Sequence, residues 1–427
     1  MTTGSAWNGR RVLVSGAGGL LGAALCRRLL AEGARVTGTI RRRSAPEGVA
    51  ALPCSLDHGP WLDEVLDAAD AEFVFHLASP IDLGRDPQLL DALWGPIVRA
   101  SVQLAERCRE RDLRLVHVGT CEEYGAVEPP YREDQVVRPV CPYGVAKAAA
   151  TSAVLGLAAQ GLRANVVRPF LTYGPGMRPA GLLGGALAAA RAGRPFPMTR
   201  GTQTRELNFV DDQVEGLLRA AGDDAVGTLL NLGGGEELPV RTLAETVFEV
   251  VGADPGLVQV GVLPDRPAEQ ARFCGDHRLA TELLGPWRRT PLVEGLQATL
   301  AAGPTESSLA GVRTEPVVRF DDPRGALLKV HPHPVAGEVY VVTCAPGEVR
   351  GEHRHQRMGE WFTALSGEGV VRFETADGTA EHTLVGQRVY VPAGCGHAVV
   401  NTGTDELVVA AFAERAHDPD DVEAVAL

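Results

Sequence analysis

The fold of this chain is decided by the stretch Arg11–Gly22, which reads RVLVSGAGGLLG. Its first five residues are rich in branched apolar side chains and predict a buried strand, after which glycines recur at every third position as a helical pattern begins. Glycines at this spacing let the backbone turn tightly and approach a pyrophosphate, which lies against the N-terminus of the helix. The stretch therefore predicts a dinucleotide-binding turn. The residues expected at the cofactor here are Gly16, Gly19, Leu20, Leu21 and Gly22.

The alternation of strand and helix continues to about residue 302. Short β-rich runs, such as Phe73–Leu77 and Leu115–Gly119, are separated by helical stretches rich in Ala, Leu and Arg. Two of these helical stretches are Pro96–Arg111 and Lys147–Gln160. This rhythm predicts an α/β, Rossmann-like fold with a doubly wound parallel sheet.

The pattern changes from residue 313 onward. Alternating apolar runs separated by Gly, Pro and Asp turns predict an all-β domain, an antiparallel jelly roll or barrel. We therefore expect a dinucleotide-binding domain over residues 8–302, a linker over residues 303–312 and an all-β domain over residues 313–427.

The composition excludes several classes of partner. The net charge of −13 argues against nucleic acid and against an anionic membrane surface. We find no signal peptide and no apolar stretch long enough to span a bilayer. The eight cysteines include no CxxC pair, so we expect reduced thiols in a cytoplasmic protein.

The residues after the second expected strand distinguish between two cofactors. An NAD site carries an acid there, which binds the ribose 2′-hydroxyl, whereas this chain has Ile40 at about that place. Arg41 and Arg42 follow, and guanidinium groups suit a 2′-phosphate. We therefore predict NADP(H), with a solvated basic turn as the alternative interpretation.

A candidate catalytic group lies in the middle of the first domain. Tyr143 and Lys147 are four residues apart at the start of an expected helix, so both side chains share one face. The ammonium of Lys147 can lower the pKa of Tyr143 and bind the nicotinamide ribose. The tyrosine can then exchange a proton with a carbonyl oxygen as hydride moves. Thr120, at the end of the preceding strand, can hydrogen-bond the same carbonyl.

These features make residues 10–302 similar to the extended short-chain dehydrogenase/reductase family of nucleotide-sugar epimerases, dehydratases and ketoreductases. The segments that carry the resemblance are the glycine turn, Phe75–Ala78, Thr120 with Tyr124 and Gly125, Tyr143 with Lys147, Arg168 with Pro169, Tyr173–Gly176, Arg205–Asp212, Asn231–Gly233, and Arg266 with Pro267 and Glu269. The resemblance implies that Thr120, Tyr143 and Lys147 form the catalytic triad. It also implies that the cofactor is contacted by Leu77, Ala78 and Pro169, in addition to Tyr143 and Lys147.

The resemblance assigns Arg205 and Arg266 to the nucleotide diphosphate, because guanidiniums bind phosphate groups in a bidentate manner. Surface ion pairs are the alternative role of these two arginines.

The substrate side of this half departs from the family pattern in two places. Leu171 stands where the family often has an asparagine. Thr120–Glu122 resembles the Thr-x-Glu of 4,6-dehydratases, so Glu122 is either a catalytic base or a polar residue near the pocket. The Glu-Glu-Tyr-Gly form is similar to 4-keto-6-deoxy-sugar 4-reductases and favours a reductase.

Two further motifs lie in the all-β part and match cupin signatures. They read Gly347-x5-His353-x-His355-x4-Glu360-x6-Gly367 and Gly386-x5-Pro392-x-Gly394-x2-His397-x3-Asn401. His353 and His355 alternate along one strand and so share a face, and Glu360 and His397 are expected from neighbouring strands. Three imidazoles and one carboxylate suit a divalent metal, Zn foremost, with Fe, Mn or Ni as alternatives.

The all-β part from Val317 onward also resembles the C-terminal domain of bifunctional capsular-polysaccharide enzymes that make UDP-linked N-acetyl-L-fucosamine precursors. The shared residues are Asp321, Asp322, Arg324, Gly325, Gly351, His353, His355, Gly367, Gly369 and His417–Pro419. In those enzymes the zinc cupin epimerises C3 of a 4-keto sugar nucleotide, and the preceding reductase then reduces C4 with NADPH. The sequence does not rank the candidate acid–base residues, which are Lys329, His331, His333, Tyr340 and Tyr390.

Three hypotheses follow. In the first, the chain is a bifunctional enzyme whose cupin epimerises an NDP-4-keto-6-deoxyhexose at C3, or at C3 and C5, and whose reductase sets C4 with NADPH. In the second, it is an NADP-dependent 4,6-dehydratase with Glu122 as the base. In the third, it is a ketoreductase whose cupin is structural or binds a sugar. All three imply a nucleotide-diphosphate sugar as the partner, and the resemblance implies a homodimer.

Overall fold

The computed structural model describes residues 5–41, 44–54, 60–178, 181–234, 237–264, 270–302, 313–316, 318–322, 325–329, 337–375, 378–415 and 421–425. The chain divides into two compact units, unit 1 over Met1–Gly303 and unit 2 over Pro304–Leu427. The segment expected to be a linker, residues 303–312, lies outside the described residues.

Unit 1 is built on a seven-stranded sheet whose order is β10-β6-β5-β4-β1-β2-β3. Its strands are β1 (Arg11–Ser15), β2 (Arg35–Ile40), β3 (Ala50–Pro53), β4 (Phe73–His76), β5 (Arg114–Val118), β6 (Ala164–Pro169) and β10 (Leu229–Leu232). Every neighbouring pair is parallel. The order reverses between β1 and β4, and ligands of such sheets bind at that point, beyond the carboxyl ends of the strands. The predicted Rossmann-like parallel sheet is confirmed.

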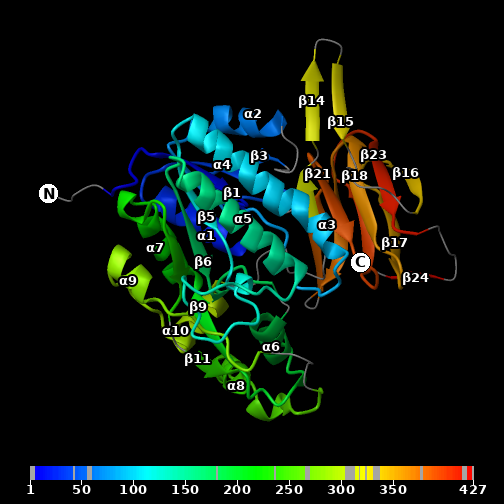
Figure 1. The fold of residues 1–427 in the computed structure, drawn as a ribbon. Helices are drawn as coiled ribbons and strands as arrows, with labels where there is room; N and C mark the ends of the chain where they lie inside the picture. Colours follow the sequence, from blue (N-terminus) through cyan, green and yellow to red (C-terminus); the bar gives the residue numbers. More distant parts are fainter. Residues whose placement is uncertain are drawn as a thin grey trace. The chain divides into compact units, whose positions relative to one another are not determined.

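Alternation along the strands builds a core on each face of this sheet. On β1, Val12 and Val14 belong to one apolar cluster and Leu13 to another. The first cluster includes α1 (Leu20–Ala31) and α7 (Val210–Ala220). The second includes α2 (Pro60–Ala69), α4 (Ala100–Glu110) and α5 (Pro142–Ala158), which lie together on one face of the sheet in Figure 1. Because successive strand residues point to opposite faces, both faces of the sheet are covered by helices.

Two helices differ from their predicted extents. The predicted helix Pro96–Arg111 is preceded by α3 (Leu89–Leu93), and its own first turn is a π-helix, η1 (Trp94–Arg99), which passes into α4. Pro96 has no backbone N–H and cannot make the usual helical hydrogen bond, which accounts for the widened turn around it. Helix α5 begins at Pro142, so it extends the helical stretch Lys147–Gln160 by five residues and includes Tyr143 in its first turn, as the motif of Tyr143 and Lys147 predicts; proline is well suited to the first position of a helix.

Smaller sheets and helices complete unit 1. A three-stranded sheet has the order β11-β9-β7, and β8 pairs with β12. These elements are β7 (Leu171–Tyr173), β8 (Phe196–Met198), β9 (Thr204–Phe209), β11 (Glu237–Pro239), β12 (Val258–Val260), α6 (Gly181–Arg191), α8 (Val240–Val251), α9 (Arg278–Leu284) and α10 (Leu292–Ala301). Short 3-10 turns are η2 (Cys121–Glu123), η3 (Asp223–Ala225) and η4 (Pro255–Leu257). Among the described residues, no helix is long and apolar enough to cross a membrane.

Unit 2 is all-β, as predicted, over its described residues. One five-stranded sheet has the order β13-β21-β18-β23-β16, a second has the order β20-β19-β22-β17-β24, and β14 pairs with β15. The strands are β13 (Arg313–Pro316), β14 (Val318–Asp322), β15 (Gly325–Lys329), β16 (Val339–Cys344), β17 (Val349–His355), β18 (Glu360–Ser366), β19 (Gly369–Thr375), β20 (Gly378–Thr383), β21 (Gln387–Val391), β22 (His397–Asn401), β23 (Leu407–Ala413) and β24 (Val422–Ala424). Phe362 and Val409 from the first sheet share one core with Phe373 and Val399 from the second, so the two sheets pack face to face.

Candidate functional site

The glycine turn after β1 leaves no room for side chains. Gly16 has a φ of +76°, in the region that favours glycine, and a Cβ there would lie 3.0 Å from the backbone of Ala78. A Cβ on Gly22 would lie 2.2 Å from the carbonyl oxygen of Gly16. Gly19 caps the N-terminus of α1, where Leu20 begins the helix. The backbone of the turn therefore packs closely against both α1 and the residues that follow β4, as a pyrophosphate-binding turn requires.

Ser15 joins the carboxyl ends of β1 and β4. Its Oγ accepts hydrogen bonds from the backbone N–H groups of Leu77 and Ala78, each at 3.0 Å. The same Oγ lies 2.7 Å from Nδ1 of His76, whose Nε2 lies 3.1 Å from Oγ of Ser101. Leu77 and Ala78 are thus fixed at the edge of the sheet where the cofactor is expected.

The remaining residues predicted to contact the cofactor are placed as follows. Strand β2 ends at Ile40, which is buried, and Arg41 directly after it is exposed. Arg42 lies outside the described residues. Pro169 ends β6 at the same edge of the sheet and is half-buried.

Thr120, Tyr143 and Lys147 come together beyond the end of β5. Tyr143, in the first turn of α5, is buried, and the side chains of Ser79 and Thr120 lie near enough to lower its pKa. Lys147 lies one turn further along α5, and its Nζ donates to the carbonyl oxygen of Val118 at 2.5 Å. The structure therefore brings the three predicted catalytic residues to one place.

Burial dominates the electrostatics of this group. It raises the pKa of Tyr143 well above its ordinary value, against hydrogen bonds from Ser79 and Thr120 that lower the pKa. Burial also lowers the pKa of Lys147 to about 8, against the attraction of Glu123, which raises it. The expectation that Lys147 lowers the pKa of Tyr143 is thus outweighed by desolvation. The tyrosine is held as a proton donor, and the lysine titrates close to neutral pH.

Glu122 is half-buried and lies within the electrostatic influence of Arg205. Burial raises the pKa of Glu122, and the guanidiniums of Arg205 and Arg85 oppose the rise. Arg205 lies on β9, and one of its guanidinium nitrogens donates to the carbonyl oxygen of Gln270 at 3.0 Å. Arg266, the second predicted phosphate ligand, lies outside the described residues.

A buried carboxylate that sequence reasoning did not single out lies beside the predicted triad. Glu123 is fully buried, and its Oε1 accepts the N–H of Thr120 at 2.9 Å and the hydroxyl of Thr151 at 3.0 Å. Its Oε2 accepts from Nε and a terminal nitrogen of Arg168, at 2.9 and 2.8 Å. A signal was present in the sequence, because an arginine inside the apolar run Ala164–Arg168 needs a buried anion.

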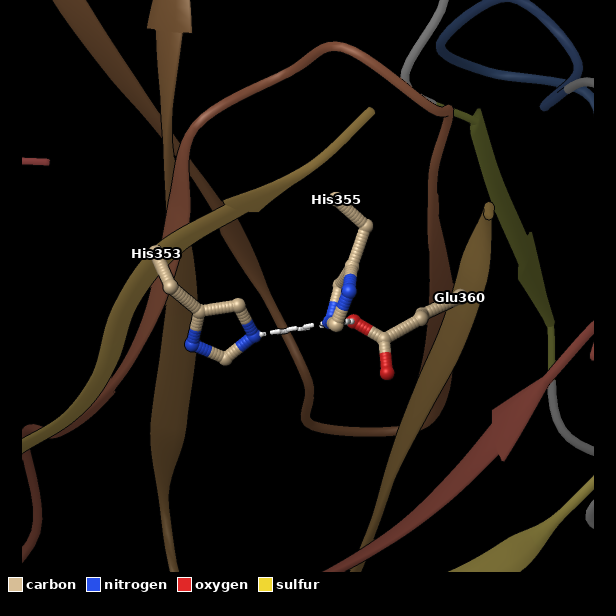
Figure 2. Close-up of side chains that lie close together, drawn as sticks. All are labelled: His353, His355 and Glu360. Atoms are coloured by element: carbon tan, nitrogen blue, oxygen red, sulfur yellow. Dashed lines mark hydrogen bonds and ion pairs between the residues drawn. The ribbon is translucent and has the colours of Figure 1, made fainter. Parts of the chain in front are cut away.

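The four residues predicted to bind a metal lie together in unit 2. The Nε2 atoms of His397, His355 and His353 lie 3.0, 3.3 and 4.0 Å from the same oxygen, Oε2 of Glu360. The Nε2 atoms of His353 and His355 are 3.0 Å apart. Figure 2 shows these two imidazoles and the Glu360 carboxylate pointing toward one another. The ligand atoms of His353, His355 and Glu360 all lie within 4.8 Å of one another, which is close enough for them to share a single divalent ion.

The prediction about the strands that carry these ligands is right for His397 and wrong for Glu360. His397 lies on β22, which pairs with β17, and it is directly opposite His353 in the register. Glu360 lies on β18, which belongs to the other five-stranded sheet. The carboxylate therefore reaches the imidazoles across the sandwich, because the two sheets pack face to face.

Further groups orient these four side chains. His397 has its Nδ1 3.1 Å from the carbonyl oxygen two residues earlier, and the Tyr340 hydroxyl donates to Glu360. The buried carboxylate of Asp421 lies 3.9 Å from Nδ1 of His355. Burial raises the pKa of Glu360, but hydrogen bonds from His355, His397 and Tyr340 outweigh it and hold the pKa well below its ordinary value. Carboxylates and carbonyls behind imidazoles are the usual outer partners of metal ligands.

The structure separates the candidate acid–base residues of unit 2. Tyr340 contacts the cluster through Glu360, whereas the Tyr390 hydroxyl donates to Glu414 at 2.9 Å. His331, His333 and the side chain of Lys329 lie outside what the structure describes.

Comparison with known proteins finds a matching family model for each part of the chain. Residues 12–233 match the family model "NAD dependent epimerase/dehydratase family", and residues 320–425 match "Polysaccharide biosynthesis C-terminal domain". A dTDP-glucose 4,6-dehydratase of Streptomyces griseus is 30% identical over 312 residues, covering 68% of this chain and 93% of the relative. A UDP-glucose 4-epimerase of Mycolicibacterium smegmatis is 31% identical over 315 residues, covering 68% of this chain and 97% of the relative.

Solved structures agree with the sequence comparison over the same share of the chain. MoeE5 in complex with UDP-glucuronic acid and NAD is similar with a TM-score of 0.62 and 29% identity, over 68% of this chain and 98% of that one. Its complex with UDP-glucose and NAD is similar to the same extent, at a TM-score of 0.62 and 30% identity, over 68% of this chain and 97% of that one. The glycine turn, the Thr120–Tyr143 contact and these matches show that the chain belongs to the NAD dependent epimerase/dehydratase family.

Proposed function

We propose that the chain reduces an NDP-4-keto-6-deoxyhexose at C4 with NADPH in unit 1 and epimerises it at C3, or at C3 and C5, in unit 2. The observation that carries the reductase is the contact of Thr120 with the protonated Tyr143, with Lys147 one helical turn away. A Kitasatospora kifunensis relative named dTDP-6-deoxy-L-talose 4-dehydrogenase (NAD(P)(+)), 30% identical over 321 residues, supports redox chemistry at C4 of a deoxysugar.

The triad has a defined task in such a reduction. A bound reduced nicotinamide would supply the hydride for the C4 carbonyl carbon. The Tyr143 hydroxyl donates its proton to the carbonyl oxygen, so the ketone becomes an alcohol. The Thr120 hydroxyl hydrogen-bonds the same oxygen and stabilises the charge that develops there. Lys147 would bind the nicotinamide ribose, and its charge would favour tyrosinate until a solvent proton restores the hydroxyl.

The preference for NADPH is part of this proposal and rests on Ile40 and Arg41. Reversing the charge with Arg41→Glu should raise KM for NADPH about tenfold or more, because a 2′-phosphate carries negative charge, and should leave KM for NADH within twofold. Arg35→Glu is the matched control, because Arg35 is exposed at the opposite end of β2. Equal use of NADH and NADPH by the unaltered chain would reject the preference.

Unit 2 is proposed to be a metal cupin. His353, His355, His397 and Glu360 would hold a divalent ion, which would supply Lewis acidity beside the sugar C4 carbonyl. After dialysis against a zinc salt, the chain should retain about one metal ion per molecule. Mass spectrometry of the native protein measures this number. Glu360→Gln should abolish this retention, whereas His382→Ala should not, because His382 stacks on Phe373 outside the cluster.

One incubation in D2O tests both reactions together. The chain, NADPH and an NDP-4-keto-6-deoxyhexose are mixed, and the sugar product is read by NMR and mass spectrometry. Reduction at C4 with deuterium at C3 is the expected outcome, since removal and return of the C3 proton exchanges it with solvent. Reduction without deuterium would reject the epimerase and leave unit 2 a structural or sugar-binding role. No oxidation of NADPH with any such sugar would reject the reductase.

A 4,6-dehydratase is the second candidate, and the position of Glu122 favours it. This carboxylate is half-buried and its pKa is raised by burial, against the charges of Arg205 and Arg85, and a raised pKa makes a carboxylate a stronger base. A dehydratase returns its hydride to the sugar and consumes no cofactor, whereas a reductase oxidises one NADPH per turnover. An NDP-hexose that loses water with only catalytic NAD(P)+ present, and a Glu122→Gln variant that does not, would establish the dehydratase.

A further inference from the structure

We propose that Glu123 is the positioning residue of the catalytic group, whose buried carboxylate holds Thr120 in place and supplies the counter-charge of Lys147. This inference rests on the proposed function only for the roles of Thr120 and Lys147. The contacts that carry it belong to the described structure.

The first contact fixes Thr120. The Glu123 Oε1 accepts the backbone N–H of Thr120 at 2.9 Å, while Thr120 caps the 3-10 turn η2 that contains Glu123. Thr120 and Glu123 therefore form a reciprocal capping box. Since the Thr120 backbone is held by this bond, its hydroxyl is held where it meets Tyr143.

The second set of contacts fixes Glu123 itself. Arg168 on β6 binds its Oε2 through two nitrogens, and Thr151 on α5 donates to its Oε1 at 3.0 Å. Glu123 is 0% exposed, and the Arg168 guanidinium also lies 4.5 Å from the centre of the Tyr124 ring. The carboxylate thus bridges the turn after β5, strand β6 and helix α5, which are the elements that carry or border the proposed triad.

The third link is to Lys147. Its ammonium is buried, donates to Val118 and is attracted by Glu123. The other titratable groups facing it are His76 on β4 and His117 on β5, both of which burial and Lys147 keep neutral by lowering their pKa. Glu123 is therefore the negative charge among the groups that act on Lys147.

The chain offers an unusually direct readout of this link. It contains only two lysines, Lys147 and Lys329. Full-length protein labelled with 13C at the lysine ε-carbon will give two NMR signals, and Lys329→Arg will identify which belongs to Lys147. The titration midpoint of Lys147 is expected near pH 8. In Glu123→Gln it should fall by about one unit, because the counter-charge is lost.

A matched variant distinguishes a specific effect on Lys147 from a general loss of stability caused by removing a buried carboxylate. Glu206→Gln removes another fully buried carboxylate, which pairs with His277 at 2.9 Å. It should lower Tm and leave the Lys147 midpoint unchanged. If Glu123→Gln leaves that midpoint unchanged too, the inference is overturned, whether or not any substrate for the chain has been found.

The role toward Thr120 is tested by removing both charges of the buried pair. Arg168→Met alone should lower Tm strongly, because it leaves an unpaired buried carboxylate. The double variant Glu123→Met/Arg168→Met should recover most of that Tm, because two apolar side chains of similar length replace the pair.

The kcat of the double variant distinguishes a positioning role of Glu123 from a purely structural one. If Glu123 positions Thr120, kcat for reduction should stay about tenfold or more below that of the unaltered chain, with KM for the sugar nucleotide within threefold. Full recovery of kcat with Tm would show a merely structural ion pair and overturn the inference. An unaltered chain without reductase activity would instead reject the proposed function and leave the NMR result standing.

Discussion

Tyr143 is the residue on which the proposed proton transfer depends. Tyr143→Phe removes only the hydroxyl and should lower kcat about 10²- to 10⁴-fold while leaving NADPH affinity within threefold. Tyr173→Phe is the control. Tyr173 lies on β7, and its hydroxyl makes a 3.4 Å contact with the Leu292 carbonyl, so the variant removes a hydroxyl that has no role in the proposed proton transfer. Stopped-flow oxidation of NADPH and fluorescence titration measure the two quantities. A Tyr143→Phe variant with more than half of the original kcat would contradict the proposed role.

Lys147 should set the alkaline limit of activity. Its pKa is lowered to about 8 by burial, so the ammonium is present below that pH and lost above it. Because Tyr143 keeps its proton well beyond that range, the loss of rate belongs to the lysine. We expect kcat for ketone reduction to fall as the pH rises through about 8, with the slope of a single ionisation. A rate that stays constant to pH 10 would show that the charge of Lys147 is not needed.

At the scale of elements, the close approach of α1 to the glycine turn should be visible in a pair of glycine variants. Gly22→Ala puts a methyl group 2.2 Å from the Gly16 carbonyl oxygen, so it should cost about 1–3 kcal/mol of stability and weaken dinucleotide binding. Gly156→Ala in α5 meets nothing within 4 Å, and it should stabilise the chain by about 0.5–1 kcal/mol. Urea unfolding with and without NADPH measures both. Equal changes in stability for the two variants would show that the glycine turn can shift to make room for the methyl group at residue 22.

At the scale of the whole molecule, the two units have separate cores and should respond to different ligands. The clusters that include Val12 and Leu13 belong to unit 1, and the cluster that includes Phe373 belongs to unit 2. A ligand raises the melting temperature of the unit that binds it. In calorimetry of the full chain, NADPH should raise one transition and zinc another, and Glu360→Gln should remove only the zinc effect. A single transition that both ligands raise equally would mean that the units unfold together.

The predictions that succeeded concern short-range patterns. The run Arg11–Gly22 was enough to predict β1, the tight turn and α1, because turn chemistry and strand period are local properties. The spacing of Tyr143 and Lys147 predicted one shared helix face, and the two histidines of β17 predicted one shared strand face.

Other features depended on which elements meet in space. The sequence shows two adjacent acids, Glu122 and Glu123, and does not say that the first is half-buried while the second is fully buried against Arg168. It also does not say that Glu360 reaches the imidazoles from the opposite sheet.

The sequence by itself therefore determined the elements, the parallel and all-β halves, and the residue types available for chemistry. Only the tertiary structure decided that Glu123 is buried against Arg168 beside Thr120, that Glu360 reaches the imidazoles from the opposite sheet, and how low the pKa of Lys147 lies. The physical reason is that periodicity and turn formation depend on neighbours along the chain. Desolvation and charge pairing depend on neighbours across it, such as Glu123 and Arg168, which are 45 residues apart.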